Sequence, residues 1–306
     1  MAAGKVGIVI LNWNGWQDTI ECLRSVFGIT YPSYSVTVVD NGSTDGSVAR
    51  IREWAGTNSK AVELVELPAN AGYAAGNNAG IREVLFDPSV EYILVLNNDT
   101  TVSPDFLEKM TDVFAMYPQC GLVGPTILNY STGEYVQAHW ARRMTWTDVL
   151  MFNTPLKVIF LREPFINRHI LKGSKPAEFY TVSGCCLLFR REALQAIKLF
   201  DEGTFLGWEE CVVSEKLLAA GYKVYVAPAA SIHHKIGAST AKLPSAEKTL
   251  AFLKSERFVI KNFLRFPRGQ MAALSFLESV IYSAYALLDP GLRASYGEMM
   301  KVIRDI

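Results

Sequence analysis

Short β-branched runs alternate with helical stretches over the first 125 residues of the chain. The apolar runs predict four buried strands, and the periodic stretches between them predict three helices. The strands are expected at residues 6–11, 35–40, 61–66 and 92–96, and the helices at residues 16–26, 47–54 and 74–85. Continuous apolar strands separated by helices are typical of a parallel sheet covered on both faces. We therefore expect an α/β fold.

The regular pattern fades between residues 131 and 175, where aromatic and basic residues are frequent. This stretch suggests an insertion beside a binding face. Further on, the pattern predicts strands at residues 179–189 and 223–226, helices at 191–197 and 209–220, and helical structure from 246 to the end. Breaks in the last region are expected at Pro267 and Pro290.

Polar clusters follow three of the predicted strands, at residues 12–14, 40–45 and 97–99. Turn chemistry could explain any one of them, because Asn, Asp and Gly dominate turns. Three clusters at corresponding strand ends instead favour a ligand site, since ligands bind beyond the carboxyl ends of parallel strands. No GxGxxG motif follows the first strand, which argues against a dinucleotide-binding fold.

The residue types in these clusters fit a nucleotide bound with a metal ion. Asp40 ends a buried strand, and a carboxylate there can accept the N3–H of uracil or thymine, while Asp45 caps the following helix. The glycine-rich segment 70–80 leads into a helix N-terminus, which favours an anionic or polar ligand. Asp99 offers the oxygen ligand that Mg²⁺ or Mn²⁺ prefers, but needs help from the diphosphate and another side chain.

Charge and cysteine content exclude several classes of protein. Thirty Lys and Arg balance thirty Asp and Glu, so no basic field for nucleic acid is expected. The five cysteines are odd in number and lack CxxC spacing, so neither a disulfide framework nor a zinc ribbon is expected. Cys185 and Cys186 lie in an apolar run and are predicted to be small buried thiols. The first apolar run is too short for a signal peptide. The best candidate for a spanning helix, residues 271–288, is interrupted by Glu278.

These segments resemble, in order, the family 2 glycosyltransferases, especially the rhamnosyltransferase-like branch of envelope polysaccharide synthesis. The resemblance covers residues 5–240 and rests on segments 11–15, 38–45, 70–80, 97–99, 182–185, 190–193 and 199–202. It implies a GT-A fold, which is a Rossmann-like mixed, mostly parallel sheet flanked by helices, here with a helical C-terminal extension. Residues 1–245 would form the catalytic domain, with a nucleotide-sugar-binding half (1–125), an acceptor-side insertion (131–175) and a catalytic half (176–245), followed by a C-terminal region (246–306).

The resemblance also implies roles for individual residues. Asp40 would contact the base, and Asp99 would bind the divalent cation (Mn²⁺ or Mg²⁺) on the donor diphosphate. The second acid of a pair is the expected general base, which is Glu210, with Glu209 as the alternative. His234 would be a second metal ligand, with His233 as its competitor. The other expected nucleotide-sugar-binding residues are Asn12, Asn14, Asn41, Gly72, Tyr73, Asn77 and Asn98.

We therefore expect an inverting glycosyltransferase that moves a sugar from a UDP- or dTDP-sugar, with dTDP-rhamnose a candidate, to a glycan or lipid-linked acceptor. The family usually has Asp at the second acidic position and another Asp two residues later, where this chain has Glu210 and Val212. A misplacement of about 1 Å can cost about 10²-fold in rate. A catalytically weak nucleotide-sugar-binding or scaffold subunit is therefore the alternative. A nucleotidyltransferase would need a glycine-rich, lysine-containing loop that residues 12–15 do not provide.

Basic and aromatic residues are interspersed through residues 252–268. Such a pattern suits a helix lying in a membrane interface, although an ordinary helix packed on the catalytic domain has the same pattern. We expect a cytoplasmic protein with peripheral contact to the inner face of the cytoplasmic membrane.

Overall fold

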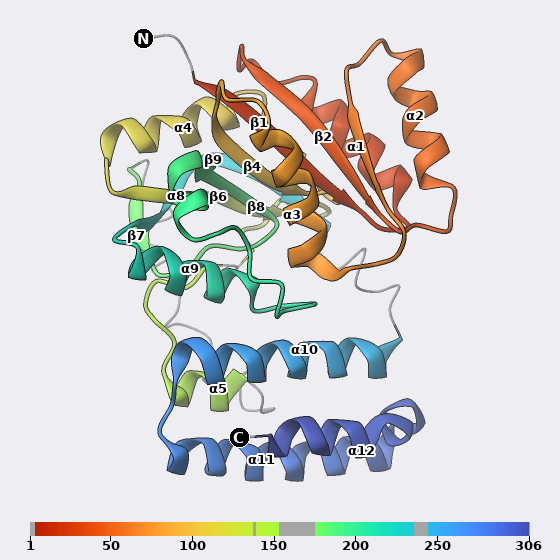
Figure 1. Ribbon diagram of the computed structural model, residues 1–306, viewed down its shortest axis with the longest axis vertical. Coiled ribbons are helices and arrows are strands. Elements are labelled where there is room, and N and C mark those ends of the chain that lie inside the picture. The colour runs from red at the N-terminus through yellow and green to blue at the C-terminus, as the bar shows by residue number, and fades with distance from the viewer. Residues whose placement is uncertain (1–3, 137–138, 153–174, 236–243, 306) are drawn as a thin grey trace.

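The computed structural model describes residues 4–136, 139–152, 175–235 and 244–305 (Figure 1). Its centre is a nine-stranded mixed sheet in the order β3-β2-β1-β4-β8-β6-β9-β5, with β7 paired to β9. The α/β fold predicted from the sequence is therefore confirmed, and helices cover both faces of the sheet.

The first half of the sheet is parallel, as its apolar runs predicted. It consists of β1 (Lys5–Asn12), α1 (Trp16–Val26), β2 (Tyr34–Asn41), α2 (Ser47–Thr57), β3 (Glu63–Leu67), α3 (Gly72–Leu85) and β4 (Val90–Asn97). Alternation along β1 builds the two layers of the core. Val6, Ile8 and Ile10 face a cluster with α1, α2 and α4, whereas Val9 faces a cluster with α3, α8 and α9.

The second half departs from the prediction in three places. The elements β5 (Thr100–Val102), α4 (Phe106–Met116) and β6 (Cys120–Asn129) were not predicted. The run at residues 179–189 is not one strand, because β7 (Ala177–Phe179) pairs with β9 while β8 (Cys186–Arg190) lies antiparallel to β4 and β6. The final strand, β9 (Lys223–His234), runs eight residues beyond the predicted end, since its second half pairs with β5 and β6.

The remaining elements surround the site. The helices α8 (Arg191–Ala196) and α9 (Glu209–Ala219) lie near their predicted positions. Of the predicted insertion, the structure describes α5 (Trp146–Phe152) and the segment before it, whereas residues 153–174 lie outside the described part of the chain. All five cysteines are buried and free, which confirms the prediction of buried thiols for Cys185 and Cys186.

Three C-terminal helices form a separate layer beneath the α/β unit (Figure 1). They are α10 (Ser245–Val259), which continues into a π-helical turn (Ile260–Leu264), then α11 (Arg268–Leu288) and α12 (Pro290–Arg304). The breaks at Pro267 and Pro290 occur where they were predicted. In the described residues, α11 alone is long and apolar enough to cross a membrane, judged by length and composition. One such helix is weak evidence of a span.

The aromatic residues of 252–268 lie against the protein rather than in solvent. Phe252, Phe258, Phe263 and Phe266 pack on a buried cluster that includes Trp208, just before α9, and Met271 of α11. Ordinary packing on the catalytic domain therefore accounts for these side chains, and the predicted membrane-facing role of the aromatic residues in this stretch is not what the structure shows.

Candidate active site

The register of the parallel strands brings the predicted polar clusters together. Asn12 at the end of β1 lies opposite Asp40 of β2, and its neighbour Leu11 lies opposite Asn97 of β4. Because these carboxyl ends share one edge of the sheet, three segments far apart in the sequence line one site.

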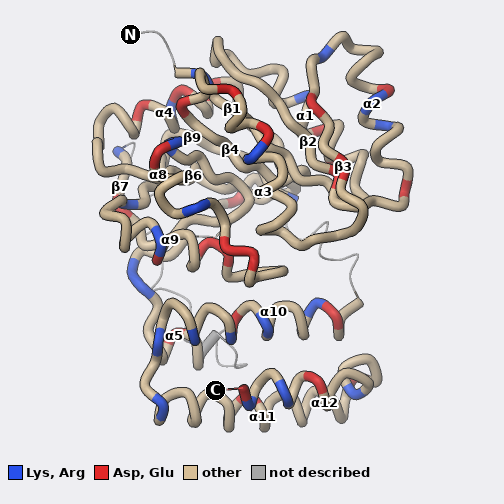
Figure 2. Tube along the Cα trace, viewed as in Figure 1, with Lys and Arg blue, Asp and Glu red and all other residues tan. Residues whose placement is uncertain are grey.

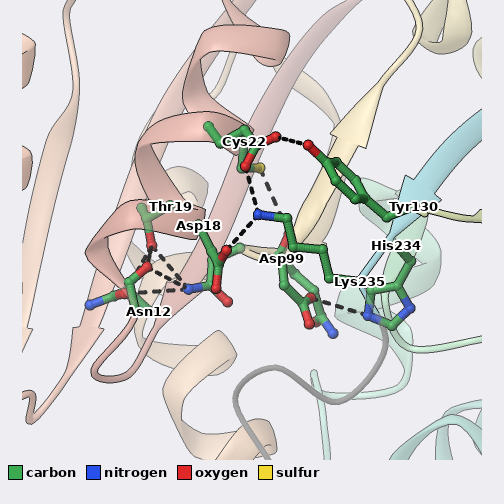
Figure 3. Close-up of polar contacts among 12 residues, drawn as sticks. Asn12, Asp18, Thr19, Cys22, Asp99, Tyr130, His234 and Lys235 are labelled. Carbon is green, nitrogen blue, oxygen red and sulfur yellow. Dashed lines mark hydrogen bonds and ion pairs between the residues drawn. The ribbon is translucent and has the colours of Figure 1, made fainter.

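Asn12 is completely buried and connects these segments (Figure 3). Its Nδ2 donates to Asp40 Oδ1 at 2.7 Å and to Ser43 Oγ at 3.1 Å. Its Oδ1 accepts from Thr19 Oγ1 at 2.8 Å and from Asn98 Nδ2 at 3.3 Å. Every hydrogen-bonding atom of the amide is thus engaged within the protein, so Asn12 orders the loops of the site.

Asp40 and Asn14 hold the loop after β2. Asp40 is 2% exposed, and its Oδ2 accepts from the Ser43 backbone N–H at 2.9 Å. Asn14 adopts a left-handed φ of 50°, and its Oδ1 accepts from the Thr44 backbone N–H at 2.7 Å. Neither residue lines the cavity described below. Contact between Asp40 and a base stays a prediction.

The loop before α3 is fixed by Asn41. Its Oδ1 accepts from the Ala71 N–H at 2.9 Å, and its Nδ2 donates to Gly72 O at 3.2 Å. Gly72 has a φ of +85°, and a Cβ there would come within 2.8 Å of Phe205 O, so both conformation and contact require glycine. Tyr73 donates its phenol to Gly184 O at 2.5 Å.

Asn77 lies one turn further along α3 than Tyr73. It is fully buried, donates to Tyr73 O at 2.9 Å and does not line the cavity. Its Oδ1 has no hydrogen-bond partner within the described residues, and a ligand-binding role for Asn77 stays a prediction.

Asp99 and His234 meet at the end of β4, as Figure 3 shows. Pairing of β5 with β9 places Thr100 opposite His234, and His234 Nε2 lies 3.1 Å from Asp99 Oδ1. Burial lowers the pKa of His234, but contacts with Asp99 and Cys185 outweigh burial and raise it to about 10. Asp99 is 4% exposed, and its Oδ1 accepts no other hydrogen bond within the described residues.

At that pKa His234 is protonated and pairs with Asp99 as a cation, so its nitrogen could bind a metal ion only after losing the Nε2 proton. A divalent cation that displaced this proton would find a buried carboxylate oxygen and an imidazole nitrogen, which suit Mn²⁺ or Mg²⁺ bound to phosphate. The described residues contain no group of three His, Cys, Asp or Glu side chains that could enclose a metal ion. His233, the competing ligand, is not among the residues that line the cavity, whereas His234 is.

Two left-handed residues place the acidic pair. Gly207 (φ 80°) and Trp208 (φ 73°) turn the chain so that α9 begins at Glu209. Glu209 is 4% exposed, and its Oε1 has no hydrogen-bond partner within the described residues. Glu210 Oε1 accepts from the Gly184 N–H at 2.7 Å.

The two acids have different environments. Burial and the charge of Glu210 raise the pKa of Glu209 to about 8. Burial also raises the pKa of Glu210, while the Gly184 N–H opposes that shift. The raised pKa of Glu209 favours its protonated form at neutral pH, whereas the hydrogen bond from the Gly184 N–H favours the ionised form of Glu210. Separation of two acids in this way is typical of acid–base sites.

Two cavities meet at Glu210. The first, of about 290 Å³, lies at the strand ends and is lined by residues that include Asn41, Asn98 and His234. The second, of about 270 Å³, is lined largely by apolar side chains: Trp140, Met144, Val182, Trp208 and Phe252. Ser183, Gly207 and Glu210 line both cavities. Glu210 thus lies on the wall between them.

The sequence model of glycosyl transferase family 2 matches residues 7–198, more than half of the chain. The chain belongs to glycosyl transferase family 2. An N-acetylglucosaminyl-diphospho-decaprenol L-rhamnosyltransferase of Mycobacterium tuberculosis is 29% identical over 250 residues, which cover 78% of each chain. This similarity confirms the predicted resemblance to rhamnosyltransferase-like members. A poly-β-1,6-N-acetyl-D-glucosamine synthase of Staphylococcus epidermidis is 24% identical over 74% of this chain and 48% of the relative.

Solved structures of glycosyltransferases share the fold. GalNAc-T7 with UDP, GalNAc and Mn²⁺ has a TM-score of 0.60 at 17% identity and covers 84% of this chain and 47% of that one. The mannosyltransferase PcManGT of Pyrobaculum calidifontis, in complex with GDP-Man and Mn²⁺, also has a TM-score of 0.60 at 17% identity, over 98% of this chain and 85% of that one. These similarities confirm the predicted GT-A fold.

Several residues that line the site of this family 2 glycosyltransferase were not predicted from the sequence. In the first cavity they include Trp13, Ser183, Gly184, Cys185 and Phe205. Behind them, His139 is 1% exposed, and its Nδ1 accepts from the Ser183 N–H at 3.2 Å. Burial lowers the pKa of His139 to about 4, so the ring is neutral and can accept this bond.

Val212 occupies the position where the family usually has a further acid. It is 1% exposed and packs in an apolar cluster with Met144 and Tyr180. The side chain lines neither cavity, so this departure from the family pattern lies behind the wall of the site.

The raised pKa of Glu209 predicts how stability changes with pH. An acid whose pKa is higher in the folded protein contributes less stability as pH rises from 4.5 to about 8. Replacing Glu209 with Gln removes this loss. We therefore expect the difference in free energy of unfolding, E209Q minus parent, to increase as pH rises through that interval. Urea unfolding at several pH values across the interval measures this difference, with E247Q at an exposed position as the control. A difference that does not change with pH would contradict the raised pKa of Glu209.

Proposed function

We propose that this chain is an inverting glycosyltransferase that moves a sugar from a UDP- or dTDP-sugar to a lipid-linked or glycan acceptor. The observation that carries the proposal is the place of Glu210 on the wall between two cavities. A general base must reach the acceptor hydroxyl and lie on the face of the sugar opposite the leaving diphosphate. A carboxylate shared by a donor cavity and an acceptor cavity meets that requirement.

The strand-end cavity is the proposed donor site. Asn41, Gly72, Tyr73 and Asn98 line it, and Asn98 is held by Thr19 and by the Gly15 carbonyl. Asp99 and His234 would hold a divalent cation, which would neutralise charge on the departing diphosphate. Amide groups held in fixed positions suit the hydroxyl and phosphate oxygens of a nucleotide sugar.

Glu210 is the proposed base. Its ionised carboxylate is oriented by the Gly184 N–H and would take the proton of the acceptor hydroxyl as that oxygen attacks the anomeric carbon. A single displacement requires no covalent intermediate, so the configuration at this carbon inverts. The neutral Glu209 behind it limits charge repulsion within the pair.

The second cavity is the proposed acceptor site. Its lining by Trp140, Met144, Trp208 and Phe252 provides apolar and aromatic surface for a sugar ring or for the first part of a lipid carrier. The M. tuberculosis relative, named for a lipid-linked acceptor and an L-rhamnosyl product, supports this class of acceptor and makes dTDP-rhamnose the first donor to test. A lipid-linked acceptor fits action at the cytoplasmic face of a membrane.

A binding panel tests the donor assignment. We expect calorimetry with UDP-, dTDP- and GDP-sugars to show binding of one uridine or thymidine donor, strengthened by Mn²⁺ or Mg²⁺. Binding of a GDP-sugar alone would contradict the proposed uridine or thymidine donor. Absence of binding to every nucleotide sugar would contradict the donor site itself.

Gly184 provides a test of how Glu210 is positioned. A Cβ on this residue would lie 2.5 Å from Glu210 Oε1, the mobile end of a side chain, so G184A should fold while displacing the base. Displacement on the order of 1 Å predicts about a 10²-fold lower kcat. Steady-state kinetics measure the change. G56A is the matched control, because nothing lies within 4 Å of its new Cβ. An unchanged kcat in a folded G184A would contradict the role of Glu210.

A further inference from the structure

A cavity of about 490 Å³ lies at the corner between α10 and α11, far from the strand ends. Four cationic residues line it (Arg257, Lys261, Arg265 and Arg268), against one carboxylate, Asp305. Figure 2 shows Lys and Arg positions along this connection. Arg268 is also the first residue of α11, where unpaired helical N–H groups add positive potential. The lining of this cavity is therefore positively charged overall, as expected for a site that binds an anion.

Arg257 shows that the site is built into the fold. It is 5% exposed, and its Nη2 pairs with the buried Glu278 of α11. Its Nε and Nη1 have no hydrogen-bond partner within the described residues. Buried donors without partners are costly, so the protein gains if an anion binds there. Guanidinium groups bind phosphate oxygens in this way.

An apolar surface begins beside this cavity. Phe276, Val280 and Leu287 are 72%, 53% and 75% exposed, and their spacing puts them on one face of α11. Glu278 lies on the opposite face and is buried against Arg257. The buried ion pair holds one side of α11 against α10, so the apolar side faces solvent along the length of the helix. Such a helix suits a position in the plane of a bilayer.

We propose that the Arg257–Arg268 corner binds the phosphate of an anionic lipid headgroup while the exposed face of α11 enters the outer part of the bilayer. Arg257 is paired with Glu278 and Lys261 lies 3.7 Å from Asp305, whereas Arg265 and Arg268 form no ion pair within the described residues. Charge complementarity therefore favours a membrane surface over a second copy of this chain, because an apolar contact between copies would supply no counter-charge for these two arginines. α10 also contributes Phe252 to the proposed acceptor cavity. If the proposed function holds, docking brings that cavity to a lipid-linked acceptor.

Sedimentation of the full chain with vesicles tests the proposal independently of catalysis. Vesicles of phosphatidylcholine containing phosphatidylglycerol should bind the protein, and vesicles of phosphatidylcholine alone should bind it weakly. The triple variant K261Q/R265Q/R268Q changes exposed residues only and should weaken binding to anionic vesicles on the order of 100-fold, at about 1 kcal/mol per charge. F276S/L287S should weaken binding to both kinds of vesicle.

Matched controls carry the same changes on the α/β unit. R52Q/K60Q/K109Q removes three charges there, and F86S/M116S removes two exposed apolar side chains. Equal losses in these controls would overturn the proposal. Calorimetry with inorganic phosphate separates the sources of the anion: phosphate binding without vesicle binding would assign a free anion and overturn the lipid. Conversion of a dimer to a monomer by F276S/L287S, with vesicle binding unchanged, would instead assign this face to a second copy.

Discussion

E210Q should lose about 10²–10⁴-fold in kcat for sugar transfer, the range that general base assistance contributes. Gln has the same shape and can still accept the Gly184 N–H, so the wall between the two cavities should persist. Donor affinity should therefore be unchanged. Steady-state transfer rates and donor calorimetry on the same preparation separate the two quantities.

The pH profile adds a second readout for this variant. A general base must be ionised to act, and burial raises the pKa of Glu210. We therefore expect kcat/KM to fall as pH is lowered, with a midpoint above the ordinary pKa range of glutamate. E210Q should lose that pH dependence. The neighbouring E209Q is the control, because the neutral Glu209 resembles Gln at neutral pH. A larger loss of kcat in E209Q than in E210Q would move the role of base to Glu209.

D99N should cost on the order of 10²–10³-fold in kcat, comparable to the loss of one group that stabilises a developing oxyanion. The substitution keeps the shape of a nearly enclosed side chain but removes the charge beside His234. Binding of Mn²⁺, followed by electron paramagnetic resonance, should weaken in parallel. This readout does not depend on turnover.

The exposed D112N on α4 provides the matched control for D99N and should leave both Mn²⁺ binding and kcat unchanged. Full Mn²⁺ affinity in D99N would contradict the metal role of Asp99. Full activity in the presence of a chelator would contradict metal dependence itself.

The sequence predicted the parallel half of the sheet because strands buried on both faces appear as continuous apolar runs. It did not predict β6, since Gly121, Gly124 and Pro125 interrupt that run. The structure explains both glycines, because a Cβ on Gly121 would lie 2.8 Å from Tyr222 Cβ and one on Gly124 would lie 2.7 Å from Val182 Cβ. Long-range contacts of this kind have no local signature.

The loop at residues 180–185 was missed for a similar reason. Its composition is apolar and small, as in a strand, but Asn97 N–H donates to Cys185 O and Gly184 N–H donates to Glu210. Both partners lie far away in the sequence. The same contacts turn Gly184 into part of the site, a role that no spacing along the chain could indicate.

Motifs indicated Asp99, Glu210 and His234, and the fold brings these residues to one cavity or its edge. The proposed acceptor cavity could be anticipated only in part. The stretch at 131–175 suggested a binding face and contributes Trp140, but nothing in the sequence indicated that the distant Phe252 would join it. The C-terminal helices show the converse. Aromatic and basic residues in α10 suggested a membrane face, whereas burial assigns the exposed apolar face to α11.

Transfer of a radiolabelled sugar tests the central claim most directly. The donor identified by binding would be incubated with the protein, Mn²⁺ and a membrane lipid extract, and label in the lipid fraction would be measured beside release of nucleoside diphosphate. The account predicts equal appearance of both products with the parent protein and loss of both with E210Q. Donor binding without either product, for the parent protein as for E210Q, would contradict it and identify a nucleotide-sugar-binding subunit.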